Sequence, residues 1–302
     1  MPADSIDKDG NGHGTHCAGT VASKKYGVAK RAEIVAVKVL SDSGSGSMSD
    51  VTGGVLWAVE HAKKQSAEFA ANPNSLKAKK HRGYVANMSL GGGKSPTLDR
   101  AINGATISGL AFAVAGGNEN QDACNVSPAG AEGPVTVGAS TIQDERAYFS
   151  NKGKCVDIFA PGLNILSTWN TGNTSTNTIS GTSMASPHVC GILAYYLSLI
   201  SAPSHQADEL SFGLKSSNAL LRFMPLQETL GYYFFQAAQW LFGGAPQLQH
   251  NVAYVASLPI RSVSTPGDLK KLIVNVSTKG ALKGLDKATV NSLIFNNATI
   301  NK

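Results

Sequence analysis

The feature that most constrains this chain is an alternation of apolar runs with helical patterns between residues 32 and 169. Four apolar runs are typical of buried strands, because they are short and end at Gly or polar turns. They span residues 32–40, 84–90, 110–115 and 135–139. Strands that alternate with helices over this length predict an α/β fold, with a mostly parallel sheet and helices on both faces. Ligands of such sheets bind at the carboxyl ends of the strands.

Helical patterns separate these strands. Apolar residues recur at every third or fourth position from Val51 to Ala62, and Ser49 or Asp50 is placed to cap a helix there. Two further helices are expected, at about 96–108 and 183–200, and the last is strongly apolar.

Composition excludes several other classes of protein. The 32 Gly residues and the charged fraction of 15% argue against a disordered chain or a coiled coil, both of which are rich in charge. No run of 18 apolar residues occurs, and the first 30 positions hold no apolar stretch of signal-peptide length, so neither a membrane span nor a secretion signal is predicted. We expect the chain to begin within a longer protein.

Charge and cysteine spacing exclude two kinds of site. The net charge is +6, but the densest basic stretch, residues 77–82, has no interleaved aromatic side chains that would stack on bases. We therefore favour a solvated loop over a nucleic-acid site. The four cysteines form no C-x-x-C pair, so a zinc site is not predicted and at most one disulfide is expected.

The pattern changes after residue 200. Residues 203–262 have no clear period and hold an aromatic cluster at 231–242, whereas a helical pattern resumes at Thr265. The chain therefore divides into 1–200, 201–264 and 265–302. Three interpretations of the middle part remain open, in the order in which we favour them: a translated, unspliced intron, a genuine insertion, and an amphipathic contact with a membrane or a partner.

One candidate catalytic segment is S-G-T-S-M-A-S-P-H, residues 180–188. Gly181 permits a tight turn, Ser183 opens a helix, and Pro187 lies within the first turns. The Ser183 hydroxyl is thereby expected at the positive end of the helix, which favours the negative charge of an acyl-transfer reaction. A plain N-cap serine is the alternative for this segment alone. His188 is expected to be a structural core histidine.

The other candidate segment is D-G-N-G-H-G-T-H-C-A-G-T, residues 9–20. The small residues around His13 suit a closely packed helix that presents one imidazole to a cleft, so His13 is the candidate general base. The alternatives are that His13 and His16 bind a metal, or that both are ordinary polar residues. We disfavour zinc, because no third ligand and no H-E-x-x-H motif stands nearby.

With A-G-G-N at 115–118 between them, these motifs resemble the subtilisin-like serine proteases, and within them the proteinase K branch and its fungal cerevisin-like vacuolar members. The order His, Asn, Ser is that of the family, and the resemblance covers about residues 7–200 and 265–297. It implies a three-layer α/β/α fold. Residues 1–200 are then a catalytic domain that lacks its N-terminal part, and 265–302 are the C-terminal end of that domain.

The resemblance implies a serine endopeptidase of broad specificity. His13 would take the proton of Ser183, Ser183 would attack the peptide carbonyl and form an acyl-enzyme, and Asn118 with the Ser183 N–H would hold the oxyanion. Loss of such an Asn costs about 10²–10³ in turnover. Three Gly-rich segments would bind an extended substrate by backbone pairing or line the pocket for the side chain before the cut. These substrate-binding candidates are Gly44, Ser45, Gly46, Ser89, Leu90, Gly91, Gly92, Ala115, Gly116 and Gly117.

One family residue has no counterpart. The family has an Asp in a D-T/S-G turn well before the His, but only 12 residues precede His13, and Asp42-Ser43-Gly44 follows it. Loss of the Asp leaves the imidazole in the wrong tautomer and lowers turnover by about 10⁴. We therefore expect an N-terminally incomplete piece of an active protease, itself weak or inactive. The alternative function is an inactive fragment known chiefly as a fungal allergen or antigen.

The resemblance also implies a Cys124–Cys155 disulfide, which suits an oxidising vacuolar or secreted route. Asp157 matches a calcium-ligand position, with an ordinary surface Asp as the alternative, and Cys17 is expected to be a buried free thiol. No cofactor is required, and structural calcium is the one option. The expected partners are protein and peptide substrates and the propeptide of the parent precursor, for a monomer without nucleic acid or a membrane span.

Overall fold

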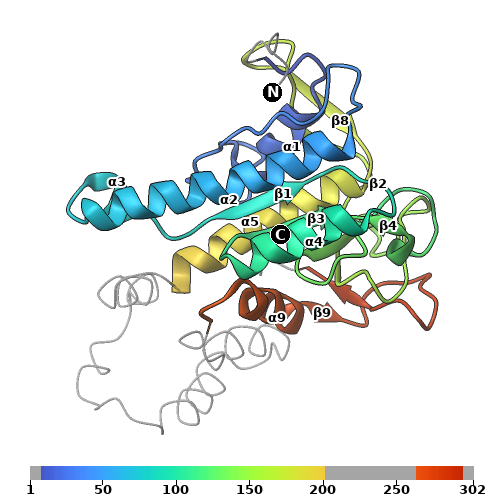
Figure 1. Ribbon diagram of the computed structural model, residues 1–302. Helices are drawn as coiled ribbons and strands as arrows, with labels where there is room; N and C mark the ends of the chain where they lie inside the picture. The colour runs from blue at the N-terminus through green and yellow to red at the C-terminus, as the bar shows by residue number, and fades with distance from the viewer. Residues whose placement is uncertain (1–7, 201–262, 295–302) are drawn as a thin grey trace, which may run out of the picture.

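The computed structural model describes residues 8–200 and 263–294, and a six-stranded sheet forms its centre (Figure 1). The strand order is β1-β3-β5-β6-β10-β9. The strands are β1 (Val85–Met88), β3 (Ala111–Ala115), β5 (Val135–Ser140), β6 (Ile158–Pro161), β10 (Ser292–Leu293) and β9 (Thr278–Lys279). All neighbouring pairs from β1 to β10 are parallel, and β9 pairs antiparallel with β10. The predicted α/β fold with a mostly parallel sheet is confirmed.

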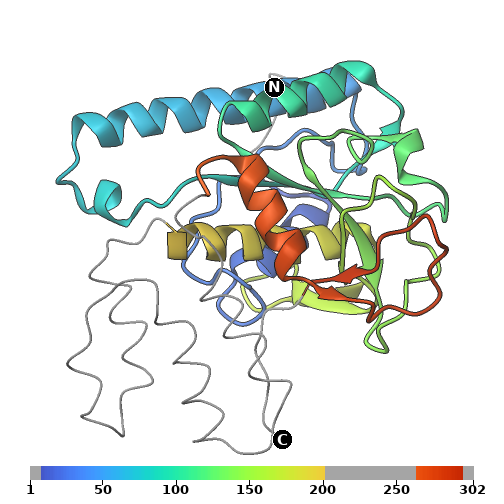
Figure 2. The ribbon, with the colours of Figure 1, turned by 90° about the horizontal axis from the view of Figure 1, so that it is seen from below.

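Helices cover both faces of the sheet, as predicted. Helices α2 (Met48–Ala71) and α4 (Pro96–Ile107) lie on one side, and α5 (Thr182–Ile200) lies on the other (Figure 2). Helix α1 (His13–Ala22) packs against α5. Strand β3 is apolar throughout because side chains on both of its faces are buried. Phe112 and Val114 enter the core beneath α2 and α4, whereas Ala111 and Ala113 join the core formed with α5, because successive side chains of a strand point to opposite faces.

Smaller elements complete the described fold. They are α3 (Leu76–Lys80), the 3₁₀ turn η1 (Ala123–Asn125), β2 (Gly92–Gly93) paired with β4 (Val126–Ser127), and β7 (Ile165–Thr168) paired with β8 (Thr176–Ile179). Both of these pairs are antiparallel.

The helix ends follow local capping chemistry. Helices α4 and α5 begin and end within one residue of the predicted positions. Helix α2 begins earlier than predicted because Ser47, and neither Ser49 nor Asp50, is the N-cap, and the Ser47 side chain accepts the Asp50 N–H at 3.1 Å. It also continues beyond the predicted apolar stripe to Ala71, over a stretch whose side chains are mostly exposed.

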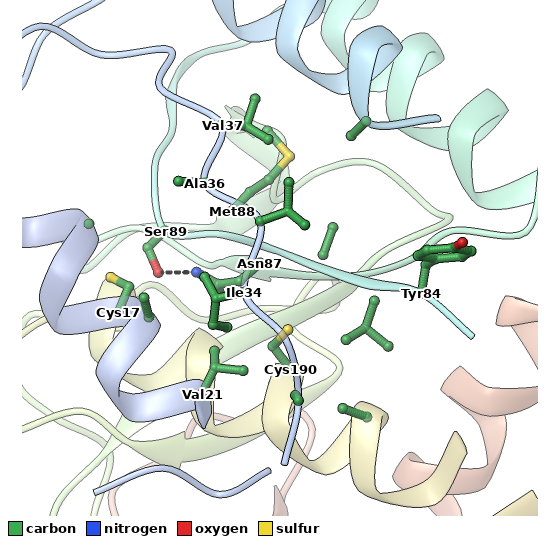
Figure 3. A pocket seen from close by; sticks show the side chains of 18 of the residues that line it. Cys17, Val21, Ile34, Ala36, Val37, Tyr84, Asn87, Met88, Ser89 and Cys190 are labelled. Atoms are coloured by element: carbon green, nitrogen blue, oxygen red, sulfur yellow. Dashed lines mark hydrogen bonds between the residues drawn. The ribbon is translucent and has the colours of Figure 1, made fainter. Parts of the chain in front are cut away.

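The strand predicted at 32–40 is wrong. The backbone there pairs with no strand of residues 8–200 or 263–294, and Ile34, Val35 and Val37 are 46%, 50% and 41% exposed. Among the strands that the structure describes, β1 is an edge strand that pairs with β3 alone. A cavity of about 2160 Å³ separates 32–40 from β1, and side chains of both segments, α1 and α5 line it (Figure 3). The run has the composition of a strand, but no strand lies beside it in the described part of the chain, so the predicted pairing does not form.

The C-terminal part returns to the same core. Helix α9 (Pro266–Val276) begins after Thr265, where the helical pattern resumes, and Thr265 forms a capping box with Asp268. Leu269, Leu272 and Ile273 of α9 join the core beneath α5. The part predicted at 201–264 lies, apart from its last two residues, outside the described residues.

Among the described helices, α5 is the one that is long and apolar enough to cross a membrane by length and composition. However, 56% of its most apolar window is buried. Its side chains pack against α1 and the sheet, which is the environment of a core helix.

Candidate active site

Ser183 lies in the first turn of α5, at the N-terminal end of the helix as the sequence predicts. Its Oγ donates to the carbonyl of Ser89 at 3.3 Å, and Ser89 Oγ donates to the carbonyl of Ser183 at 2.6 Å. These two bonds join the N-terminus of α5 to the residue that follows β1. The Ser183 N–H belongs to the first turn, where backbone donors have no partner within the helix. It is therefore free to bind an anion.

Asn118 is held so that its amide N–H₂ group faces the same place. Asn118 Oδ1 accepts the N–H of Thr182 at 2.8 Å and the hydroxyl of Thr182 at 2.9 Å, which leaves Nδ2 as the free donor. A Cβ added to Gly181 would lie 3.5 Å from Asn118 Nδ2 and 3.6 Å from Ser183 N. Both donors therefore border one small space that Gly181 keeps clear of a side chain. Two converging donors of this kind can stabilise an oxyanion.

His13 is the first residue of α1, and Asp9 holds the start of that helix. Asp9 Oδ1 accepts the Gly12 N–H at 2.8 Å, and Oδ2 accepts the N–H and the hydroxyl of Thr15 at 2.8 and 2.7 Å. Burial by itself raises the pKa of Asp9, but these hydrogen bonds outweigh it and lower the pKa to about 2. Sequence reasoning missed this role, although an Asp close before a helix start is a capping signal.

The His13 imidazole is available as a base. Its burial, and then the neighbouring His16, lower its pKa below the ordinary value, and Asp9 opposes this change. The ring is therefore neutral at neutral pH and able to accept a proton. Because Ser183 Oγ is bound to Ser89, it makes no hydrogen bond to His13 here, and such catalytic bonds often form only when substrate is present.

Cys17 lies between the two candidate catalytic residues. Its Sγ is 4.0 Å from His13 Nδ1 and donates to the Ser183 carbonyl at 3.4 Å. Burial raises the pKa of Cys17 to about 11, so the group is a protonated thiol at neutral pH. The structure thus has the buried free thiol that the sequence led us to expect.

No carboxylate hydrogen-bonds the His13 ring in the part of the chain that the structure describes. Asp9 is occupied by the backbone and the hydroxyl at the start of α1. Asp42, in the D-S-G sequence that follows His13, pairs with Lys38 at 2.7 Å. His13 and Cys17 both line the cavity between 32–40 and β1. A third catalytic group for His13 is thus not supplied by the described residues.

The other two histidines of the motifs are structural. His16 is fully buried, and its Nε2 lies 3.0 Å from the Ile165 carbonyl and 3.2 Å from the Asn177 carbonyl, which joins α1 to the β7–β8 hairpin. His188 Nδ1 lies 2.8 Å from the Met184 carbonyl within α5. Residues 8–200 and 263–294 contain no group of three His, Cys, Asp or Glu side chains arranged to hold a metal.

Two of the three predicted substrate segments line the same cavity, and 115–117 does not. Segments 44–46 and 89–91 line it together with His13, and 44–46 is exposed. Gly92 differs from its neighbours, because it belongs to β2 and pairs with Ser127 of β4. Gly44 has a φ of +81° in a turn closed by the Ser41 N–H to Ser45 carbonyl bond, which explains the glycine there.

Asn151 fixes the loop that carries the third substrate segment, 115–117, and Asn118. It is fully buried, its Nδ2 donates to the Gly116 carbonyl at 2.9 Å, and its backbone N–H donates to the Gly117 carbonyl at 2.9 Å. Its Oδ1 accepts the Glu119 N–H at 3.1 Å. Sequence reasoning missed Asn151, because its partners lie more than thirty residues away along the chain.

Two expectations concern residues away from the candidate catalytic groups. Cys124 and Cys155 form a disulfide with a Cα–Cα distance of 5.3 Å. Asp157, the candidate calcium ligand, is paired with Lys270 of α9 at 2.8 Å and accepts the Thr136 N–H at 2.8 Å. Burial raises the pKa of Asp157, and the Lys270 ammonium opposes this change.

Known proteins are similar to this chain over the segment that carries these residues. The model of the subtilase family matches residues 2–218. Alkaline protease 2 of Aspergillus fumigatus is 64% identical over 200 residues, which are 66% of this chain and 39% of that protein. The subtilisin-like serine protease Pen c 2 of Penicillium citrinum is 65% identical over 200 residues, 66% of this chain and 43% of that protein.

A solved structure shares the fold. The crystal structure of a cold adapted subtilisin-like serine proteinase aligns with a TM-score of 0.65 and 36% identity, over 98% of this chain and 78% of that one. The chain therefore has the architecture of these proteins, while it spans about two fifths of the length of the curated relatives.

Proposed function

Because this chain belongs to the subtilase family, we propose that the protein is a serine endopeptidase of broad specificity with Ser183 as its nucleophile. The observation that carries the proposal is the shared space beside Gly181. The N–H of Ser183 and the amide of Asn118 converge there, at the start of the helix that holds the Ser183 hydroxyl.

The reaction follows from these groups. His13 takes the proton of Ser183 Oγ as the oxygen attacks the peptide carbonyl, and the carbonyl oxygen becomes an anion in the space beside Gly181. The anion collapses, the C–N bond breaks, and His13 gives its proton to the leaving amine. A water molecule, deprotonated by His13, then hydrolyses the acyl-enzyme and restores Ser183.

Thr182 is the positioning residue of this site. Its hydroxyl accepts the Gly117 N–H at 3.0 Å and donates to Asn118 Oδ1 at 2.9 Å, so the orientation of the Asn118 amide depends on it. Donors that are fixed before the reaction need no reorganisation as charge develops, which is the physical basis of their effect on rate.

We extend the proposal to substrates, partners and location. The exposed segment 44–46 and the partly exposed segment 89–91 suit an extended peptide that pairs with the backbone on both sides. A propeptide of the precursor would use the same cleft, and the catalytic unit would be monomeric. The Cys124–Cys155 disulfide supports a vacuolar or secreted location, because such bonds persist in oxidising compartments.

The test is covalent labelling by a fluorophosphonate, which reacts with an activated serine. We expect slow labelling of the 302-residue chain, none of Ser183→Ala, and a rate lower by about 10²–10³ in Asn118→Ala. Ser198→Ala is the matched control, because Ser198 is exposed on the same helix and bonds only its own helix backbone. Persistent labelling of Ser183→Ala at the wild-type rate would show that another residue is the nucleophile.

A further inference from the structure

Three oxygen atoms converge at the amino ends of two neighbouring strands of the sheet. Asp157 directly precedes β6, Pro134 directly precedes β5, and Glu132 lies in the loop before them. Lys270 Nζ lies 2.8 Å from Asp157 Oδ2, 2.7 Å from the Pro134 carbonyl and 2.9 Å from the Glu132 carbonyl. An ammonium group has three N–H donors, and here each finds one acceptor.

The donor set is one that a hard cation prefers. Calcium in proteins binds carboxylate and backbone carbonyl oxygens, and it takes six to eight of them at about 2.3–2.6 Å. This site supplies a carboxylate and two carbonyls, but the ammonium of Lys270 stands at their centre, and a calcium ion bound to the same three oxygens would overlap it. The residues present therefore do not fit calcium while Lys270 holds this position.

We infer that Lys270 is a built-in cation that replaces a metal ion at the oxygen site of Asp157, Pro134 and Glu132. The site then needs no free calcium, and the binding of the Lys270 ammonium to the three oxygen atoms depends on the docking of α9. Lys270 is more than 130 residues from Glu132 and Pro134 along the chain. The charge contact therefore fastens the C-terminal helix to the amino ends of β5 and β6, next to the apolar contacts of Leu269 and Ile273.

Lys270 also differs from the lysine beside it on α9. Lys271 is exposed and takes part in no salt bridge of the described residues, whereas the side chains of Lys270 and Asp157 are only 21% and 22% exposed. Screening by water is weaker at such a pair than at the surface. Lys271→Met is therefore a matched control that removes the same charge from the same helix without opening the oxygen site.

The experiment measures calcium bound at equilibrium, by dialysis against radioactive calcium, and the thermal unfolding midpoint in excess EDTA or millimolar calcium. We expect the Asp157→Asn variant to bind the same amount of calcium as the wild-type chain. Lys270→Met should lower the midpoint in EDTA by roughly 4–8 °C, as expected for the loss of a partly buried ion pair. It should bind one additional calcium ion that restores part of the midpoint, and Lys271→Met should do neither.

Two results would overturn the inference. One is a calcium ion bound by the wild-type chain and lost in Asp157→Asn, and this measurement does not depend on the folding of Lys270→Met. The other is a Lys270→Met protein that unfolds at a lower temperature but binds no additional calcium, which would make Lys270 an ordinary salt-bridge residue. Restoration of the wild-type midpoint by Lys270→Arg without calcium would support the requirement for a fixed positive charge.

Discussion

A strand supplied beside β1 should both stabilise this chain and activate it. Segment 32–40 and the free edge of β1 face each other across a cavity of about 2160 Å³. The change is an N-terminal extension. It consists, in chain order, of an apolar strand of about six residues, an Asp-Ser-Gly turn at the end of that strand and a flexible linker to residue 1. The matched control is the same extension with Asn-Ser-Gly in place of the Asp-Ser-Gly turn.

The exposed side chains set the size of the effect on stability. Ile34, Val35 and Val37 are 46%, 50% and 41% exposed, so a strand that covers them buries the equivalent of roughly one and a half apolar side chains. Full burial of one such side chain is worth about 1.5–3 kcal/mol, which gives about 2–4 kcal/mol in the free energy of unfolding. A carboxylate that orients the His13 ring should raise peptidase activity by about 10³ or more.

Three measurements check this prediction. Urea unfolding should show a similar stabilisation for the Asp and the Asn extension, hydrogen exchange should slow in 32–40 and β1, and hydrolysis of a peptide anilide should rise only with Asp. Slow exchange of the 32–40 amides in the 302-residue chain without the extension would contradict this prediction. The prediction also fails if that chain is fully active, because another carboxylate would then orient His13.

The remaining predictions test single contacts. Replacement of Cys124 and Cys155 by Ala should cost about 3–4 kcal/mol in urea unfolding, from the entropy of a loop with a separation of 31 residues, and a cost near zero would refute this origin. Thr182→Val should slow fluorophosphonate labelling by about tenfold or more. Thr182→Ser should slow it much less, because its hydroxyl can still orient the Asn118 amide. Labelling of Thr182→Val at the wild-type rate would show that Thr182 has no role in the site. Burial lowers the pKa values of His16 and His188 in the folded chain, so the unfolded chain binds more protons. The free energy of unfolding should therefore be highest above about pH 6.5 and should decline as the pH falls below that value. Unfolding free energies that do not change between about pH 7.5 and pH 5 would contradict this linkage.

The elements that the sequence predicted well are those whose signal is local. Helix α4 has a Ser cap, a Pro in its first turn and apolar residues at helical spacing, and it was predicted to within one residue. Strands β3 and β5 are short apolar runs bounded by turns, buried on both faces as predicted. The candidate catalytic motifs also carry a local signal, because the residues of each motif are contiguous.

The contacts that the sequence did not reveal join residues far apart along the chain. Asn151 reaches the Gly116 carbonyl across 35 positions, and Lys270 reaches the Pro134 carbonyl across 136. Neither residue carries a local pattern that distinguishes it from an ordinary Asn or Lys. The strand expected at 32–40 failed for a related reason. Its composition specifies a strand, but pairing also requires a neighbour, and a single run of residues cannot show whether one is present.

In the described residues, the unpaired edge of β1 and the His13 ring without a carboxylate partner lie at the same place, which follows from the geometry of a parallel sheet. Strand β1 ends at Met88, and the next residue, Ser89, contacts Ser183. A strand inserted parallel to β1 would end at the same edge of the sheet, beside Ser89 and Cys17, and Cys17 Sγ is 4.0 Å from His13 Nδ1. A carboxylate at the end of that strand would bind Nδ1–H and leave Nε2 to accept the Ser183 proton. A single added element would therefore supply both a strand partner for 32–40 and β1 and a carboxylate for His13, neither of which the described residues provide.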